Sequence, residues 1–325
     1  MRQMNDLVIV TGGAGFIGCN VVRALNSRGL RDILIVDDLG SDAKWRNLIG
    51  LDYEDILPVD EFLPWLTQTR SWTPTSVVHM GACSSTTEQD ADYLLRNNYR
   101  YTRRVCEWSV ENGVRFVYAS SAATYGDGSL GYGDTDEVTR ALRPMNMYGY
   151  SKHQVDLWVL ANGLFKTIVG LKFFNVYGPH EDHKGDMRSV VAKAFDEIVE
   201  KGHLSLFKSY RPDVTDGEQK RDFVYVDDAV SVVLHFLDHR DVSGLFNCGT
   251  GRARSWLDLA RAVFVALGVA EDVRFIDMPI GLRSKYQYFT QADISKLRAS
   301  GYSRDFSGLE DSVSTYVRQY LSRRE

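Results

Sequence analysis

Short apolar runs alternate with longer mixed segments through the first half of the chain. The runs at residues 7–10, 32–36, 76–79 and 115–119 are rich in β-branched and other apolar residues, and segments of helical length separate them. Strands that are apolar on both faces and joined by helices are typical of a parallel sheet that is covered on both sides. The pattern therefore predicts an α/β fold with a doubly wound parallel sheet.

Two later apolar runs, at residues 167–174 and 245–248, are predicted to be further strands of this sheet. Between and after them, Gly, Pro and charged residues interrupt the alternation. We expect two domains, one that binds a dinucleotide and a smaller, discontinuous α/β domain that binds substrate. The first is predicted to comprise residues 1–174 and about 224–254, and the second about 175–223 and 255–325.

Composition narrows the functional class. With 325 residues, of which 44% are hydrophobic, the chain can bury a large core. A net charge of −5 argues against a nucleic-acid-binding protein. The four cysteines lack CxxC spacing, and two histidines within residues 180–183 are three apart rather than four, so no metal site is predicted. The sequence shows neither a leader pattern nor a bilayer-spanning apolar run, and we expect a cytoplasmic protein without a membrane partner.

Three glycines follow the first predicted strand. Gly12, Gly15 and Gly18 form a GxxGxxG pattern at the start of a helix predicted over residues 16–27. Glycine permits a tight turn and a close backbone approach to a pyrophosphate, whose charge is bound by free amides at a helix N-terminus. The pattern alone also fits a turn without a ligand. Its place between a strand and a helix favours a dinucleotide site in a Rossmann-like sheet.

Charged residues near the end of the second strand bear on the cofactor. Asp37 lies about 20 residues beyond the last glycine, where a carboxylate meets the adenosine ribose and usually favours NAD. Asp38 also fits a solvated strand end. Lys44 stands where a cation can pair with a 2′-phosphate, which favours NADP. Charge alone leaves the choice between NAD and NADP open.

Tyr148 and Lys152 form a YxxxK pattern, which on a helix places the phenol and the ammonium one turn apart on one face. A nearby ammonium is expected to lower the pKa of the tyrosine, so that it exchanges a proton with a substrate hydroxyl while a hydride moves to nicotinamide. Ser121 follows the fourth predicted strand and is placed to hydrogen-bond the reacting oxygen. Ser120, Ser121 and Thr124 also fit a role in satisfying loop backbone groups.

Nearly end to end, the chain resembles the extended short-chain dehydrogenase/reductase family, whose nucleotide-sugar members use a Ser/Thr, Tyr and Lys trio like the one above. Several blocks agree in order, and within the family they most resemble the epimerases of ADP-linked heptoses. These blocks are residues 79–88, 118–126, 146–152, 174–179 and 286–293.

The resemblance implies a reaction. ADP-D-glycero-D-manno-heptose is oxidised transiently at C6 with a bound NADP, and the hydride returns to the opposite face, which supplies L-heptose for the lipopolysaccharide core. Tyr148 is implied as one acid/base and Lys184 as the other, with Lys152 positioning the cofactor. Without the resemblance, Lys184 fits a solvated loop lysine. A homo-oligomer, often a pentamer, is also implied.

Further site residues rest on the same resemblance. Arg221 suits a substrate diphosphate because a guanidinium binds such oxygens in a bidentate way. The substrate is expected to contact Ser121, Asn175, Asp186, Lys193, Phe207, Arg221 and Tyr286. The cofactor is expected to contact Gly12, Gly15, Phe16, Ile17, Gly18, Asp37, Asp38, Lys44, Gly81, Ala82, Cys83, Ser84, Asn97, Lys152 and Val176.

Three departures from the family pattern, at Val59, Met80 and Asp186, leave the cofactor, the nucleotide and the accepted sugar open. Another nucleotide-sugar epimerase, such as a UDP-hexose 4-epimerase, is the nearest alternative, because it shares the tyrosine and lysine pair but does not need Lys184. A cofactor-binding sensor without catalysis is a third interpretation. The sensor needs only the glycine loop, so the intact Ser, Tyr and Lys set argues against it.

Overall fold

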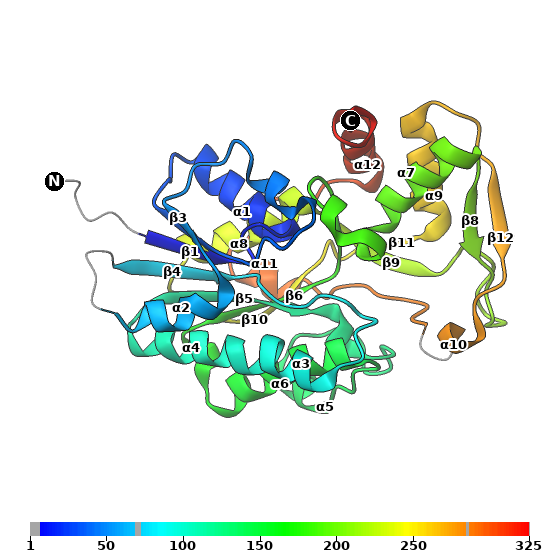
Figure 1. Cartoon of the computed structure of the whole chain (residues 1–325). Helices are drawn as coiled ribbons and strands as arrows, with labels where there is room; N and C mark the ends of the chain where they lie inside the picture. The colour runs from blue at the N-terminus through cyan, green and yellow to red at the C-terminus, as the bar shows by residue number, and fades with distance from the viewer. Residues whose placement is uncertain (1–6, 69–72, 284–285, 325) are drawn as a thin grey trace.

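A seven-stranded sheet forms the larger part of the protein (Figure 1). The computed structural model describes residues 7–68, 73–283 and 286–324, and within them every neighbouring pair of strands in this sheet is parallel. The predicted doubly wound sheet is confirmed. In spatial order the strands are β10 (Gly244–Cys248), β6 (Val169–Phe173), β5 (Arg115–Ser121), β4 (Pro74–His79), β1 (Leu7–Thr11), β2 (Ile33–Val36) and β3 (Asp55–Leu57).

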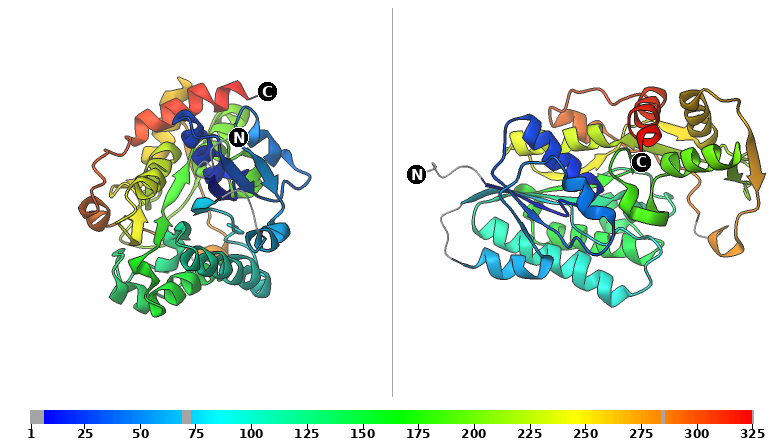
Figure 2. Two further views of the ribbon diagram at one scale, coloured as in Figure 1. Left: turned by 90° about the vertical axis from the view of Figure 1, so that its left-hand side faces the viewer. Right: turned by 45° about the horizontal axis from the view of Figure 1, so that its top comes forward.

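The strand order reverses direction between β1 and β4, which is where ligands bind to doubly wound sheets. Helices α1 and α8 pack together on one face of the sheet, while α2, α4 and α6 cover the other (Figures 1 and 2). The α-helices are α1 (Phe16–Ser27), α2 (Val59–Leu66), α3 (Ala91–Leu94), α4 (Tyr101–Glu111), α5 (Asp136–Ala141), α6 (Met147–Ala161), α7 (Val190–Lys201), α8 (Val226–Asp238), α9 (Trp256–Leu267), α10 (Ile280–Arg283), α11 (Ser295–Ala299) and α12 (Leu309–Gln319).

Short helical segments connect these elements. Five are 3-10 helices and η2 is a π-helix, among the residues that the structure describes. None of the described helices is long and apolar enough to cross a lipid bilayer. The short segments are η1 (Ala43–Leu48), η2 (Leu95–Arg100), η3 (Ala122–Tyr125), η4 (Leu164–Lys166), η5 (Asp182–Met187) and η6 (Leu321–Arg323).

Two smaller sheets and a separate apolar cluster lie beyond the large sheet. One small sheet has the order β11, β9, β7, and the other pairs β12 with β8. Helices α7, α9 and α12 contribute residues such as Val263 and Tyr316 to the cluster, whereas Leu297 and Tyr302 pack with the large sheet. The two-domain division remains a proposal. The strands are β7 (Asn175–Tyr177), β8 (Leu204–Phe207), β9 (Lys220–Tyr225), β11 (Ala253–Ser255) and β12 (Val273–Ile276).

A buried ion pair joins the strands beneath the catalytic candidates to α6. Lys172 on β6 donates to the Asp156 carboxylate at 2.8 Å, and both side chains are 0% exposed. Lys172 also donates to Thr124, while Tyr118 and Ser120 donate to Asp156. Because each charge has several hydrogen-bond partners, the pair is tolerated in the core. It links β5, β6, η3 and α6 into one rigid unit.

We predict that Lys172→Met lowers the free energy of unfolding by about 3–5 kcal/mol, because it leaves the Asp156 carboxylate buried without its counter-charge. Chemical denaturation monitored by circular dichroism measures this. The matched control is Arg28→Met, which breaks an exposed ion pair with Asp238 and is expected to cost no more than about 1 kcal/mol. Equal losses in the two variants would contradict the prediction.

Candidate active site

The glycine loop brings backbone against backbone at the carboxyl edge of the sheet. A Cβ on Gly12 would lie 2.6 Å from the Gly81 nitrogen, and one on Gly18 would lie 2.0 Å from the Gly12 oxygen. Gly12 also has a φ of +66°. Helix α1 begins at Phe16 without a side-chain cap, so its first amides have no side-chain acceptor. The first turn of α1, which begins directly after the loop, therefore offers N–H groups to an anion.

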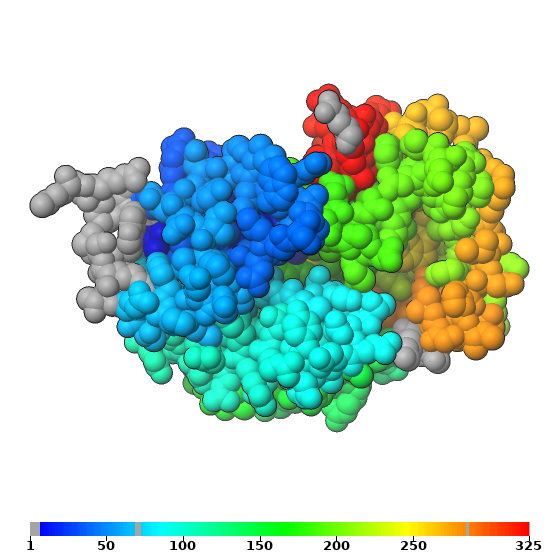
Figure 3. Space-filling model, viewed as in Figure 1, coloured from blue at the N-terminus to red at the C-terminus, as the bar shows by residue number. Residues whose placement is uncertain are grey.

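A cavity of about 430 Å³ opens above this loop. Figure 3 shows the surface hollowed between the cyan part of the chain and the blue and green parts above it. The cavity extends from the glycine loop past the β4 edge to α6 and η5. Among its lining residues are the predicted cofactor contacts Gly12, Gly15, Phe16, Ile17, Gly18, Asp37, Lys44, Gly81, Ala82, Cys83, Ser84 and Lys152.

Asp37 and Lys44 meet at one end of this cavity. Asp37 is 7% exposed, accepts from the Ala14 backbone N–H at 2.9 Å and forms an ion pair with Lys44. Asp42 caps η1 and accepts from the Lys44 N–H, which orients the lysine toward the cavity. A carboxylate and an ammonium thus stand side by side where an adenosine ribose is expected.

Three predicted cofactor contacts lie elsewhere. Asp38 is exposed outside the cavity and accepts from the backbone N–H of Val59, the first residue of α2. Val176 lines a neighbouring cavity. Asn97 donates to Asn98, and Asn98, which the sequence did not single out, exchanges two hydrogen bonds with the backbone of Cys83. Asn98 fixes the cavity wall at Cys83. The sequence alone does not distinguish Asn98 from Asn97, because the π-helix η2 decides which of the two side chains faces Cys83.

Helix α6 delivers Tyr148 to the cavity through its N-terminal turn. Asn146 caps the helix by accepting from the Gly149 N–H at 2.7 Å. Gly149 allows a close approach to η3, because a Cβ there would lie 2.6 Å from the Ala123 oxygen. Ser121 accepts from the Ala123 N–H, so its own O–H is still free to be donated.

Thr124 satisfies a loop backbone group, as one of the sequence interpretations proposed, whereas Ser120 bonds a buried carboxylate instead. Ser120 donates to Asp156, and Thr124 donates to the Ser121 carbonyl oxygen. Ser120 lines the first cavity and Ser121 the second, each together with Tyr148. Because the Ser120 hydroxyl is donated to Asp156, Ser121 is the better placed of the two to hydrogen-bond a reacting oxygen.

The expected effect of Lys152 on the tyrosine is wrong for this structure. Burial raises the pKa of Tyr148, and hydrogen bonding with Ser121 lowers it in part. Lys152 is 4% exposed and donates to the Ala119 carbonyl at 2.8 Å. Burial lowers the pKa of Lys152 to about 8, although the Asp156 charge raises it. Desolvation thus outweighs the attraction between ammonium and phenolate that the YxxxK spacing suggested.

A second cavity, of about 310 Å³, joins the first at Tyr148 and Lys184, which line both. The Lys184 ammonium lies 5.3 Å from the centre of the Phe16 ring. Burial lowers the pKa of Lys184, while the nearby Glu181 raises it. Lys184 is therefore no solvated loop lysine. Two groups able to exchange protons, one from α6 and one from η5, meet where the cavities join.

The predicted substrate residues fall into three places. Ser121 and Asn175 line the second cavity. Asp186 and Lys193 are exposed beyond it, although the Lys193 charge contributes to lowering the Lys184 pKa. Phe207, at the end of β8, is half-buried and lies outside both cavities.

Arg221 and Tyr286 lie beyond the second cavity, on the side away from the glycine loop. Arg221 is 7% exposed and lies over the rings of Trp256 and Tyr286, at 5.6 and 5.2 Å from their centres. Trp256, which lines the second cavity, donates to the Tyr286 hydroxyl at 2.8 Å, and Tyr286 lines a third cavity of about 720 Å³. Trp256 was missed by the sequence reasoning because its position depends on this distant pair.

No cluster of three or more His, Cys, Asp or Glu side chains suited to a metal ion occurs among the described residues. All four cysteines have free thiols.

Comparisons with known proteins agree with this geometry. The model of the NAD dependent epimerase/dehydratase family matches residues 8–249. An ADP-L-glycero-D-manno-heptose-6-epimerase of Nitratidesulfovibrio vulgaris strain DP4 is 52% identical over 317 residues, which are 97% of this chain and 98% of that protein. The crystal structure of the Helicobacter pylori enzyme of that name has a TM-score of 0.82 and 25% identity, with 98% of each chain covered. The Thermus thermophilus UDP-glucose 4-epimerase complex with NAD has a TM-score of 0.77 and 26% identity, covering 98% of this chain and 99% of that one.

We predict a pH-dependent stability difference between the wild type and Lys152→Met. The pKa of Lys152 falls from 10.5 in the unfolded chain to about 8 in the fold, so between these values the unfolded state binds more protons and the free energy of unfolding rises with pH. Measured by urea denaturation from about pH 7 to about pH 10, the wild type should gain stability relative to Lys152→Met. Groups other than Lys152 titrate in both proteins, and their effects cancel in the difference between the two free energies of unfolding. A difference that stays constant over this pH range would therefore contradict the prediction.

Proposed function

The chain belongs to the NAD-dependent epimerase/dehydratase family, and from that premise we propose that it converts ADP-D-glycero-D-manno-heptose to ADP-L-glycero-D-manno-heptose by inversion at C6. The observation that carries the proposal is the meeting of Tyr148 and Lys184 at the junction of two cavities. Inversion needs a proton-exchanging group for each face of the reacting carbon. The product supplies heptose for the lipopolysaccharide core.

The glycine loop and its cavity fit a nicotinamide dinucleotide, because the close-packed backbone leaves amides free for the pyrophosphate. A nicotinamide bound here would supply the acceptor and donor of the C6 hydride. Tyr148, hydrogen-bonded to Ser121, and Lys184 share the proton transfers. The group at one face, in its deprotonated form, removes the hydroxyl proton in the oxidation, and the group at the opposite face, in its protonated form, donates a proton to the same oxygen in the reduction. Lys152, anchored on the Ala119 carbonyl, would hold the ribose of the nicotinamide half.

We further propose NADP as the cofactor, with NAD as the alternative. The support is Lys44, whose ammonium stands beside Asp37 at the adenosine end of the cavity and suits a 2′-phosphate. Asp37 alone would favour NAD, because a carboxylate repels that phosphate. Since Lys44 already neutralises Asp37, the pair can accept a phosphate without a net repulsion.

For the substrate, we propose that Ser121 and Asn175 contact the heptose, while Arg221 and Tyr286 contact the nucleotide diphosphate. Their support is the path that runs from the second cavity through Trp256 to the third. Three predicted substrate contacts remain predictions: Phe207, Asp186 and Lys193. They lie outside the two cavities, so they could contact the substrate only if the segments that carry them moved toward it on binding. A homo-oligomer, expected to be a pentamer, also remains a prediction that sedimentation equilibrium can check.

A UDP-hexose 4-epimerase is the less favoured alternative, because the full-length relative described above is named for the heptose reaction. An assay separates the two. Purified protein should interconvert the two C6 epimers of ADP-heptose without net formation of NADPH. Turnover of UDP-glucose with none of either ADP-heptose would favour the 4-epimerase instead.

We predict that Tyr148→Phe and Lys184→Met each lower kcat for ADP-heptose about 10²- to 10⁴-fold, because each removes one proton-exchanging group. Bound cofactor, measured by absorbance of the denatured protein's supernatant, should be unchanged. The control is Lys201→Met, on the exposed end of α7. Full activity of Lys184→Met would remove the second acid/base from the mechanism.

We predict that Lys44→Ala weakens NADP binding at least about tenfold, while NAD binding changes less, because it removes the cation beside the 2′-position. Isothermal titration of protein stripped of cofactor measures both affinities. Arg31→Ala serves as control, since its exposed pair with Asp52 lies at the opposite end of β2. Co-purification of NAD alone with the wild type would overturn the assignment of NADP.

A further inference from the structure

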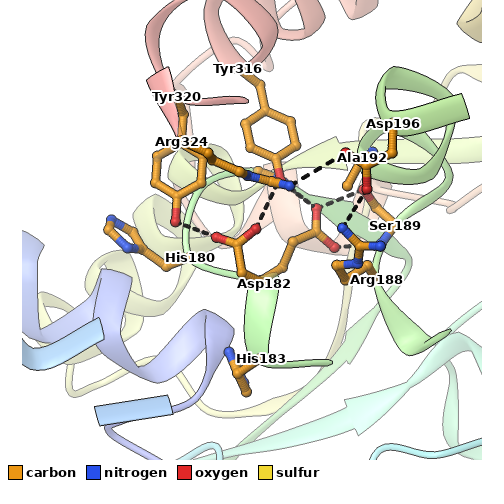
Figure 4. Close-up of polar contacts among 12 residues, drawn as sticks. His180, Asp182, His183, Arg188, Ser189, Ala192, Asp196, Tyr316, Tyr320 and Arg324 are labelled. Carbon is orange, nitrogen blue, oxygen red and sulfur yellow. Dashed lines mark hydrogen bonds and ion pairs between the residues drawn. The ribbon is translucent and has the colours of Figure 1, made fainter. Parts of the chain in front are cut away.

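The segment that carries Lys184 is held at both ends by the C-terminal part of the chain. We call residues 178–189 the Lys184 loop and residues 309–324, which comprise α12, η6 and Arg324, the C-terminal arm. Figure 4 shows Tyr316, Tyr320 and Arg324 from this arm directed at the loop. Tyr316 lies on α12, Tyr320 directly follows that helix, and Arg324 directly follows η6.

On the near side of Lys184, the arm contacts two consecutive carboxylates. Tyr316 donates to Glu181 at 2.9 Å, and Glu181 is 0% exposed. Tyr320 donates to Asp182 at 2.6 Å, and the Arg324 guanidinium lies 2.7 Å from the other oxygen of Asp182. These carboxylates stand three and two residues before Lys184, so little chain separates the held groups from the ammonium.

On the far side of Lys184, the same arginine reaches Asp196 in the middle of α7. Arg324 lies 3.7 Å from Asp196, which also pairs with Arg188 at 2.6 Å. Ser189 donates its hydroxyl to Glu181 at 2.6 Å and closes the loop upon itself. Between the two held ends, Gly185 turns the chain with a φ of +52°. One guanidinium thus contacts the loop directly before Lys184, at Asp182, and indirectly after it, through Asp196 and Arg188.

Charge supports a role beyond general stability. Glu181 is the group that raises the pKa of Lys184 against the effect of burial, and Tyr316 holds this carboxylate in place. The Arg324 side chain is 24% exposed, and the side chains of Asp182 and Asp196 are 37% and 41% exposed. Partly exposed pairs of this kind add little to folding, so the fold itself does not depend on Arg324.

We propose that Arg324 is a positioning residue for the reaction: it fixes the Lys184 loop through Asp182 and Asp196 and thereby places Lys184 against the substrate. The inference rests on the proposed epimerase function. Arg324 lines neither the first nor the second cavity and acts only through the loop. Loss of its contacts lets the loop move while the glycine loop, Asp37 and Lys44, which belong to other elements, stay in place.

The test compares Arg324→Gln and Asp182→Asn with Arg318→Gln as the matched control. Arg318 is also on α12 but donates to the Ala266 carbonyl of α9 and not to the loop. Two readouts are needed: kcat and KM for ADP-heptose, and the rate at which trypsin cuts the native protein after Lys184. The second readout reports the order of the loop and does not require turnover.

We expect Arg324→Gln and Asp182→Asn each to lower kcat about tenfold, with cofactor content unchanged, and to speed cleavage after Lys184 about tenfold. The double variant should be little worse than either single one, since both break the same contact. Arg324→Lys should restore part of kcat. Arg318→Gln should resemble the wild type in both readouts.

Two results would overturn the inference: cleavage and kcat in Arg324→Gln equal to those in Arg318→Gln, or a change in one readout without the other. If the wild type does not turn over ADP-heptose, the proposed function fails. The cleavage rates then still decide whether Arg324 holds the loop.

Discussion

The site depends on backbone packing at the point where the strand order reverses. There the turn after β1 lies so close to Gly81, just beyond β4, that Gly12 cannot carry a Cβ without striking its backbone. Helix α1 lies so close to the same turn that a Cβ on Gly18 would strike the Gly12 oxygen. This closeness removes side chains from the place where a pyrophosphate must approach the amides of α1. It also fixes β1 and β4 relative to each other, and so the distance from the cofactor cavity to β5 and α6. The positions of Ser121 and Tyr148 relative to the glycine loop therefore depend on this backbone contact.

What the sequence predicted well follows from local rules. Strands such as β1 and β2 were visible because both of their faces are buried and their residues are almost all apolar. Tyr148 and Lys152 were found because helix periodicity alone brings residues four apart together. The short edge strand β3 was not predicted, since its burial is partial and three residues carry no period. Asn98 and Trp256 were missed because contacts between distant segments give them their places.

The direction of the Tyr148 pKa shift was beyond the sequence for a different reason. Spacing shows that an ammonium is near a phenol, but it does not show how much water either group loses. In the structure both groups are desolvated, so burial raises the pKa of Tyr148 and lowers that of Lys152. Both shifts favour the neutral forms. A neutral phenol can donate its proton. A lysine with a lowered pKa can give up or take a proton closer to neutral pH, so the desolvated pair is still suited to proton exchange.

The same physics applies to Lys184, whose placement cannot be read from its neighbours in the chain. Lys184 is half-buried, which lowers its pKa, and a carboxylate three residues earlier opposes that shift. A buried carboxylate is itself costly unless it is hydrogen-bonded, and Glu181 gains those bonds from Ser189 and from Tyr316, 135 residues away. The carboxylate that raises the pKa of Lys184, the proposed second acid/base, is therefore held in part by α12. Tyr316, near the end of the chain, thus helps to set the charge environment of Lys184, which lines the same cavity as the N-terminal glycine loop.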